Sequence, residues 1–198
     1  MTMRLITVES TVLPVLENFA QRSSAQGTCL RTGKYYDNTV GSRLETDLAY
    51  IAGFLDGDGS LMLQVKTRSD TKRGVRFMAT ICFYQDTRHE KPLLWIRELF
   101  GIGYISRRND GMTELRINGF EQVRNILTKL QPHIRFKAKQ VQALIDACDM
   151  LSKKFIRELS QEELQKLVEL TFVIRKENYK SRSVLTMEKL KSVLSLTP

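Results

Sequence analysis

The ten residues from Ile51 to Ser60, which read IAGFLDGDGS, restrict the fold of this chain more than any other segment. Apolar residues at helical spacing precede them and an alternating, basic segment follows, so a helix must end and a strand must begin within them. Asp56 and Asp58 therefore lie at a helix C-terminus, where the intervening Gly57 lets the backbone turn sharply. A carboxylate beside an exposed carbonyl suits a hard cation such as Mg²⁺.

The helix before Asp56 is predicted to begin near Leu44, with Thr46 as its N-cap. Its apolar stripe comprises Leu44, Leu48, Ile51 and Leu55. Its second stripe comprises Ala49, Gly53 and Gly57, one small residue in every four. Small side chains at this spacing let a second backbone come close, so the stripe is a candidate contact with another helix. Ordinary packing within the same chain is the alternative.

Alternation and turn residues predict a helix, a hairpin, a helix, a second hairpin and a further helix, in that order. Strands at 60–68 and 75–84 flank a polar turn, and each alternates apolar with polar or basic residues. Pro92 opens a helix that ends at Gly101, and the turn at 109–111 (Asn-Asp-Gly) joins strands at 102–108 and 112–117. With a helix at 120–129, this order predicts an α+β fold with one four-stranded antiparallel sheet.

Residues 1–43 are predicted to be an N-terminal extension, and residues 44–198 the main domain. The extension has a candidate amphipathic helix near residues 12–19 and a loop rich in Ser, Thr, Gly and Arg over 20–43. Partial disorder, wrapping around the main domain and reaching toward a nucleic acid are open alternatives for it. Further helices are predicted from about residue 141, from Ser160, where Glu163 completes a capping box, and from Thr186.

The charge balance indicates a polyanionic partner. Net charge is +9 and the isoelectric point is about 9.6. A basic excess of this size favours DNA or RNA, and a solvated basic surface is the alternative. Residues 60–88 hold six basic residues against only Asp70 and Asp86. The six are Lys66, Arg68, Lys72, Arg73, Arg76 and Arg88.

Several classes of protein are disfavoured. Three cysteines without CxxC spacing predict neither a disulfide framework nor a zinc site, and two histidines are too few for a histidine-based nuclease. No apolar run approaches a membrane span, and the first 20 residues lack a signal-peptide pattern. An EF-hand loop is rejected because Thr67 stands where its bidentate glutamate would be. We expect an intracellular protein, in a prokaryotic cytoplasm or an organelle.

The run IAGFLDGDG resembles the signature of the LAGLIDADG homing endonucleases, and the likeness extends over residues 44–196. Gln85 and Thr87 follow the second strand as the family's glutamine segment does, and residues 101–105 (GIGYI) resemble the start of its third strand. Residues 130–140 (LQPHIRFKAKQ) resemble the turn that delivers a lysine to the active site. The C-terminal helices are similar to those of the single-motif, homodimeric branch.

The resemblance implies roles for individual residues. Asp58 would be a metal ligand together with the Gly57 carbonyl, Gln85 would order solvent, and Lys137 would neutralise developing charge or polarise the attacking water. Asp56 would either bind water on the metal or accept backbone hydrogen bonds, and we favour the second role. The metal would be Mg²⁺, with Mn²⁺ as a substitute and Ca²⁺ supporting binding without cleavage. Ala49, Ala52, Gly53 and Gly57 would form the dimer interface.

Strand alternation selects the residues that would face DNA in the major groove, which admits a two-stranded ribbon. From the first hairpin they are Gln64, Lys66, Arg68, Lys72, Arg73, Arg76, Met78, Thr80, Cys82 and Tyr84. From the second they are Ser106, Arg108 and Arg116, although Arg116 has an ambiguous phase and faces either DNA or solvent. A solvated charge is the alternative for each basic residue.

The resemblance implies a homodimeric, Mg²⁺-dependent endonuclease that cuts both strands of a long pseudo-palindromic DNA site and leaves 3′ overhangs. An intron-borne gene is favoured, because the chain shows no intein splicing features. Two alternatives keep the same fold: a maturase that binds intron RNA, and a DNA-binding protein that does not cleave. Metal-dependent cutting separates the endonuclease from both.

Overall fold

The computed structural model of this chain describes residues 40–67, 75–178 and 187–194. The chain forms two compact units, residues 1–46 and 47–198, and helix α2 (Val40–Asp58) runs from the first into the second. Residues 40–43, predicted as loop, already belong to this helix. Thr46 therefore lies inside α2, and its predicted role as N-cap is wrong. The helix predicted near residues 12–19 lies outside the described residues.

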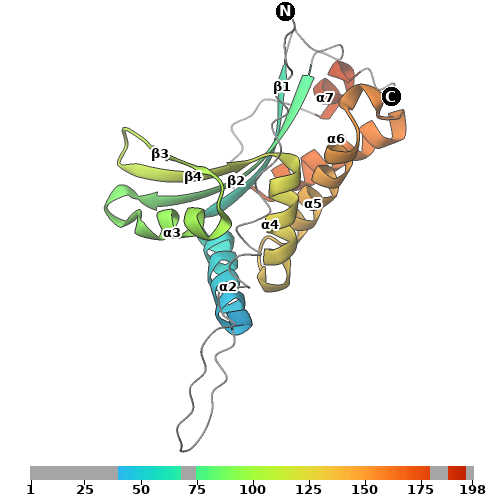
Figure 1. The fold of residues 1–198 in the computed structure, drawn as a ribbon. Helices are drawn as coiled ribbons and strands as arrows, with labels where there is room; N and C mark the ends of the chain where they lie inside the picture. Colours follow the sequence, from blue (N-terminus) through green and yellow to red (C-terminus); the bar gives the residue numbers. More distant parts are fainter. Residues whose placement is uncertain (1–39, 68–74, 179–186, 195–198) are drawn as a thin grey trace, which may run out of the picture. The chain divides into compact units, whose positions relative to one another are not determined.

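The elements after α2 follow the predicted order (Figure 1). The strands are β1 (Gly59–Thr67), β2 (Val75–Asp86), β3 (Tyr104–Arg107) and β4 (Met112–Asn118). The helices are α3 (Lys91–Phe100), α4 (Phe120–Leu130), α5 (Ala138–Lys153), α6 (Gln161–Lys176) and α7 (Met187–Val193). Short 3₁₀ turns lie at η1 (Thr87–His89), η2 (Gln131–His133) and η3 (Ile156–Glu158).

The four strands form one antiparallel sheet in the order β1-β2-β4-β3, which confirms the predicted α+β fold. Each hairpin pairs its own strands, and β2 pairs with β4 to join the two hairpins at the centre. β2 extends to Asp86, beyond the predicted end at residue 84, because its last residues pair with the start of β4. Strand β3 is shorter than predicted, since pairing begins only at Tyr104.

One apolar core lies between the sheet and the helices of the second unit. α5 and α6 pack against β1, α4 packs against β2, and α3 packs against β2 and β4. The inward residues of β2, such as Phe77 and Phe83, are buried, as the alternation predicts. Ile51 and Leu55 of α2 are fully buried in the same core. The apolar stripe of α2 therefore anchors the helix, and its C-terminal end, to the sheet.

Local signals in the sequence account for several element ends. α3 ends where Gly101 adopts a left-handed conformation with φ of 66°, which glycine reaches without strain. The second hairpin turns at Gly111, also left-handed with φ of 80°, as the Asn-Asp-Gly run predicts. Ser160 and Glu163 form the predicted capping box, in which the Glu163 amide donates to Ser160 Oγ over 3.1 Å and the Ser160 amide donates to Glu163 Oε2 over 2.8 Å.

Gly59 stands where α2 gives way to β1, and the packing leaves no room for a side chain. A Cβ at this position would lie 2.8 Å from both the Cα and the carbonyl oxygen of Leu55. Gly59→Ala should therefore lower the free energy of unfolding by about 1–3 kcal/mol, because the helix end must shift away from the strand. Urea denaturation followed by circular dichroism measures this change. Unchanged stability would show that the end of α2 can move freely.

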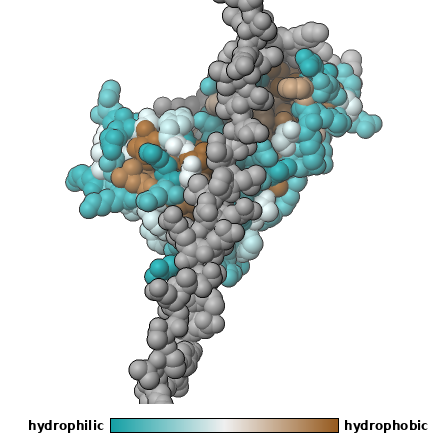
Figure 2. Space-filling view, viewed as in Figure 1, coloured by the Kyte–Doolittle hydropathy of each residue, from teal (hydrophilic) through white to brown (hydrophobic). Residues whose placement is uncertain are grey.

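None of the helices in the described segments is both long enough and apolar enough to cross a membrane. The face seen in Figure 2 is largely hydrophilic where it is coloured, with small hydrophobic patches between polar side chains.

Candidate active site

The C-terminal end of α2 presents two carboxylates in opposite ways. Asp58 and Gly57 are exposed, whereas the side chain of Asp56 turns inward and is 8% exposed. This follows from the helical period, because Asp56 comes one turn after the buried Ala52, and Asp58 is the last residue before the backbone enters β1. The exposed carboxylate of Asp58 is therefore free to meet a ligand.

Asp56 is tied to a segment that lies far away in the sequence. Its Oδ2 accepts hydrogen bonds from the amides of Arg135, over 2.6 Å, and Phe136, over 3.2 Å. Its Oδ1 accepts a hydrogen bond from the amide of Lys137 over 3.0 Å. This is the backbone-accepting role that the sequence favoured for Asp56, and it holds the turn between η2 and α5 against the end of α2.

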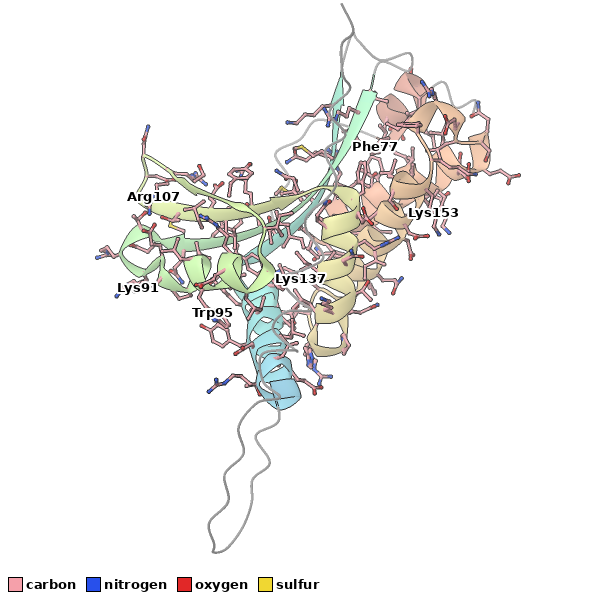
Figure 3. All side chains as sticks on the ribbon, in the orientation of Figure 1. Phe77, Lys91, Trp95, Arg107, Lys137 and Lys153 are labelled. Carbon is pink, nitrogen blue, oxygen red and sulfur yellow. The ribbon has the colours of Figure 1, made fainter. Side chains whose placement is uncertain are left out.

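The side chain of Lys137 binds the backbone at the end of α2. Its Nζ donates to the carbonyl oxygens of Leu55, over 2.8 Å, Asp56, over 2.6 Å, and Gly57, over 3.4 Å. Carbonyls at a helix C-terminus have no partner within the helix and carry partial negative charge, so an ammonium there is favourable. Figure 3 shows Lys137 at this end of α2, where the helix meets the sheet.

Burial lowers the pKa of Lys137 below the usual lysine value, and the charges of Asp56 and Asp58 partly oppose this shift. The ammonium is half-buried and close enough to Asp58 to feel its charge. The structure thus brings two of the predicted catalytic residues, Asp58 and Lys137, to one helix end, although 79 positions separate them in the sequence.

Gln85, the third predicted catalytic residue, lines the same pocket as Asp58. The remaining walls are Ala49, Tyr50, Gly53, Phe54 and Pro92. The side-chain oxygen of Gln85 accepts a hydrogen bond from the Asp86 amide over 2.8 Å, which leaves its NH₂ group as a donor. Asp58 therefore shares one pocket with a neutral hydrogen-bonding group, Gln85, and one helix end with a cation, Lys137.

Hard oxygen donors are what this helix end offers to a metal ion. The Asp58 carboxylate and the Gly57 carbonyl are both of the type that Mg²⁺ prefers. Across the described segments, no three His, Cys, Asp or Glu side chains gather into a metal site made of side chains alone. The two donors fit Mg²⁺ in kind, and water molecules usually supply much of the remaining coordination of this ion.

The small stripe of α2 lies open in the second unit. A Cβ built on Gly53 or Gly57 would meet no atom of the described residues within 4 Å, and Ala49 is also exposed. Tyr50, 57% exposed, borders this face and packs edge-on against Trp95. The exposed aromatic at position 50 was not predicted, because a helical pattern alone does not show which flanking residues remain uncovered.

Ala52 departs from the predicted interface. It is 0% exposed and belongs to the core with Ile51 and Leu55. Its side chain cannot contact a partner, so its assignment to the interface is corrected. The reason is angular: Ala49 and Gly53 share one side of α2, whereas Ala52 is turned by about 100° from Gly53 toward the sheet.

Most residues predicted to face DNA lie on the side of the sheet away from the helices. Lys66 and Arg76 are exposed and face each other across β1 and β2, while Gln64, Met78 and Tyr84 are half-buried on the same face. Like charges directly opposite each other on a sheet are unfavourable, and a polyanion would relieve that repulsion. Arg68, Lys72 and Arg73 lie outside the described residues.

Two predicted contact residues are not presented at this surface. Thr80 is 1% exposed and donates through Oγ1 to Asn118 Oδ1 over 2.7 Å. Cys82 is 0% exposed between β1 and β4, and burial raises the pKa of its thiol to about 11. Both lie in β2, where β1 pairs on one side and β4 on the other, so each has neighbours on both sides. Their assignment as DNA contacts is corrected.

The second hairpin resolves the phase of Arg116. Arg116 pairs with Cys82 and Tyr104, so it lies on the same face as Ser106 and Tyr104. Both Arg116 and Arg108 bind Glu114, whose side chain is 3% exposed. Arg116 Nε lies 2.6 Å from Glu114 Oε2, and Arg108 Nη1 lies 2.9 Å from Glu114 Oε1.

Glu114 and Tyr104 were not predicted as part of this surface. Tyr104 is 49% exposed, and its register opposite Arg116 places it there. The alternation of β3 and β4 could have identified both, once the turn at Gly111 had set the phase of the two strands.

Comparison with known proteins gives a consistent picture. The family model described as LAGLIDADG endonuclease matches residues 51–151. The DNA endonuclease I-CvuI of Chlorella vulgaris is 31% identical over 97 residues, which cover 49% of this chain and 60% of the relative. The DNA endonuclease I-CreI of Chlamydomonas reinhardtii is 30% identical over 104 residues, which cover 52% of this chain and 63% of the relative. The matched stretches thus span less than two thirds of either relative.

Solved structures show the same fold over a longer stretch. I-CvuI in complex with its target in the presence of Ca superposes with a TM-score of 0.68 at 23% identity, covering 78% of this chain and 96% of that one. The archaeal intron-encoded homing endonuclease I-Vdi141I, complexed with DNA, superposes with a TM-score of 0.67 at 22% identity, covering 77% of this chain and 96% of that one.

Proposed function

Because this chain belongs to the LAGLIDADG endonuclease family, we propose that it is a homodimeric, metal-dependent endonuclease that cuts both strands of double-stranded DNA. The observation that carries the proposal is the end of α2, where the exposed carboxylate of Asp58 follows the carbonyls that bind the Lys137 ammonium and shares a pocket with Gln85. These groups match the needs of phosphodiester hydrolysis, in which an oriented water attacks and negative charge develops.

The residues divide this work among them. Asp58 and the Gly57 carbonyl would hold Mg²⁺, which supplies an activated water and offsets charge on the phosphate when it is bound. Lys137 places a positive charge beside the reacting phosphate, where charge accumulates. Gln85 retains a donor that can orient a water molecule in the pocket next to Asp58. Mn²⁺ should substitute for Mg²⁺, and Ca²⁺ should support binding without cutting.

A second copy of the chain would complete the site. One chain carries one Asp58, and cutting two strands requires a carboxylate at each scissile phosphate. The open small stripe at Ala49, Gly53 and Gly57 ends at Asp58, so pairing two α2 helices along it would bring the two carboxylates together. Metal ions between them would offset their repulsion.

The outer face of the sheet would bind DNA in the major groove. Two sheets in a symmetric dimer would span about two turns, roughly 20 bp at 10.5 bp per turn, so the target should be a pseudo-palindrome. Lys66, Arg76 and Arg116 carry charge suited to phosphates or guanine edges, and Gln64 suits adenine. We further propose cleavage that leaves 3′ overhangs and a gene borne in an intron.

A random DNA library tests this function. The protein is incubated with the library in Mg²⁺, and separately in EDTA, and the new ends are sequenced. One enriched, near-palindromic site with matched 3′ overhangs, absent in EDTA, is the expected result. If a folded, dimeric protein produces no enriched ends, the endonuclease proposal is wrong, and binding to intron RNA becomes the next measurement.

Replacing Glu114 should change sequence discrimination more than affinity. Glu114 orients Arg108 and Arg116 through charge-assisted bonds, so Glu114→Gln frees both arginines to reach phosphates instead of base edges. The ratio of affinities for target and altered DNA should fall roughly tenfold, the worth of one weakened arginine contact to a base. Fluorescence anisotropy at fixed salt measures both affinities. An unchanged ratio would show that the ion pairs with Glu114 do not set the contacts.

A further inference from the structure

We propose that Asp56 is a positioning residue that sets the location of the Lys137 ammonium at the helix end that carries Asp58. The expected effect of Asp56 on cleavage rests on the proposed function, whereas its effect on the position of Lys137 does not. Asp56 itself is turned away from the pocket and 8% exposed, so it cannot touch a substrate. Its influence must pass through the groups that it binds.

Both carboxylate oxygens of Asp56 accept hydrogen bonds, and the donors are three consecutive backbone amides. Arg135, Phe136 and Lys137 all donate to it, over 2.6, 3.2 and 3.0 Å. Hydrogen bonds to an ionised carboxylate are shorter and stronger than neutral ones. Three of them on successive residues fix the backbone from which the Lys137 side chain starts.

The contact between Asp56 and Lys137 is reciprocal. While the Asp56 side chain holds the backbone of Lys137, the Lys137 side chain holds the backbone of Asp56 and its neighbours Leu55 and Gly57. Ordering a lysine side chain costs conformational entropy, which its contacts must offset. For Lys137, hydrogen bonds to the same short stretch of α2 fix both the backbone amide and the ammonium.

The consequence concerns the geometry of the site. Lys137 and Asp58 come from segments about 80 residues apart, and the Asp56 side chain joins those segments at the end of α2 that carries Asp58. A displacement of about 1 Å in a catalytic group can slow an enzyme roughly a hundredfold. Asp56 is therefore placed to control the rate without taking part in the reaction.

A double-mutant cycle tests the effect on cleavage. Asp56→Asn should slow single-turnover cleavage roughly tenfold to a hundredfold in otherwise unchanged protein. In a Lys137→Met background the same change should slow cleavage less than about threefold, because the group that Asp56 positions is already gone. In a Gln85→Ala background, the matched control, the full loss should remain. Rates are measured well below the melting temperature of every variant.

Equal losses in all three backgrounds would overturn the proposal, since a merely structural role of Asp56 would lower each rate by the same factor. DNA affinity in Ca²⁺ should stay within about threefold for Asp56→Asn, because Asp56 lies away from the DNA face. Asp56→Glu keeps the charge and carries less risk of unfolding, and the same cycle applies to it. The longer glutamate side chain should displace residues 135–137, and the resulting loss of cleavage rate should again depend on the presence of Lys137.

Chemical labelling of lysines tests the geometry without cleavage. Metal-free protein is treated with an amine-acetylating reagent, and the rate of modification at Lys137 is read by mass spectrometry, with the exposed Lys91 as an internal reference. Asp56→Asn should raise the rate at Lys137 several-fold and leave Lys91 unchanged. An unchanged rate at Lys137 would overturn the proposal. If the wild-type protein cuts no DNA, but Asp56→Asn still raises the labelling rate at Lys137, only the proposed function is contradicted.

Discussion

Asp58→Asn should abolish DNA cleavage and leave DNA binding intact. Asparagine is almost the same size as aspartate, but it lacks the charge that holds a divalent cation and offers a weaker oxygen donor. The single-turnover rate should fall roughly 10³-fold or more, about 4 kcal/mol in the activation free energy. Binding should be spared or slightly tightened, because Asp58 is exposed at a surface that approaches phosphates and the change removes a negative charge.

The experiment compares cleavage and binding on the same DNA target. Cleavage is followed in Mg²⁺ on gels, and affinity is measured in Ca²⁺ by fluorescence anisotropy. Asp146→Asn, which makes the same chemical change on α5 away from the pocket, serves as the matched control and should cut at the wild-type rate. An Asp58→Asn protein that still cuts would refute the assignment of Asp58 as the metal ligand.

Gly53→Leu should convert the dimer to monomers and remove cleavage with it. The second unit leaves open space over Gly53, so the new side chain fits the isolated chain. Replacing a mid-helix glycine by a good helix former should even favour α2 by roughly 0.5–1 kcal/mol. In a dimer that packs α2 against its copy, the same side chain would hold the two backbones apart.

Two measurements separate the effect of Gly53→Leu on folding from its effect on dimerisation. The melting temperature should stay the same or rise at concentrations where the protein is monomeric, and light scattering should report the loss of the dimer. Glu169→Leu, on the exposed side of α6, is the control for adding an apolar side chain to a helix surface and should leave the dimer intact. A Gly53→Leu protein that remains dimeric and active would place the dimer contact elsewhere.

The order of elements could be predicted from local patterns because each pattern acts over a few residues. The alternation that begins at Leu61 sets the inward face of β1, the turn ending at Gly111 closes the second hairpin, and Ser160 with Glu163 starts α6. The predicted helix start near Leu44 was less accurate. The structure continues α2 back to Val40, because Thr46 can cap a helix or lie inside one, and propensity alone does not choose.

The site divides in the same way. Sequence could nominate Asp58, Gln85 and Lys137, through a motif and its resemblance to a family. It could not show that Asp56 binds the segment at 135–137, nor that Glu114 holds two arginines, because both arrangements depend on segments meeting in space. Alternation also placed Thr80 and Cys82 on the correct face without showing that their neighbours cover them.

What this sequence determined by itself is therefore the set of elements, the side of each strand that enters the core, and the helix end that carries Asp58. These follow from the periods of helix and strand, which are properties of the local backbone. Tertiary structure alone decided which segment the inward carboxylate of Asp56 binds, which outward strand side chains are covered, and which charged groups pair. Burial and pairing are set by neighbours that the chain brings from about 80 residues away, and no local period encodes them.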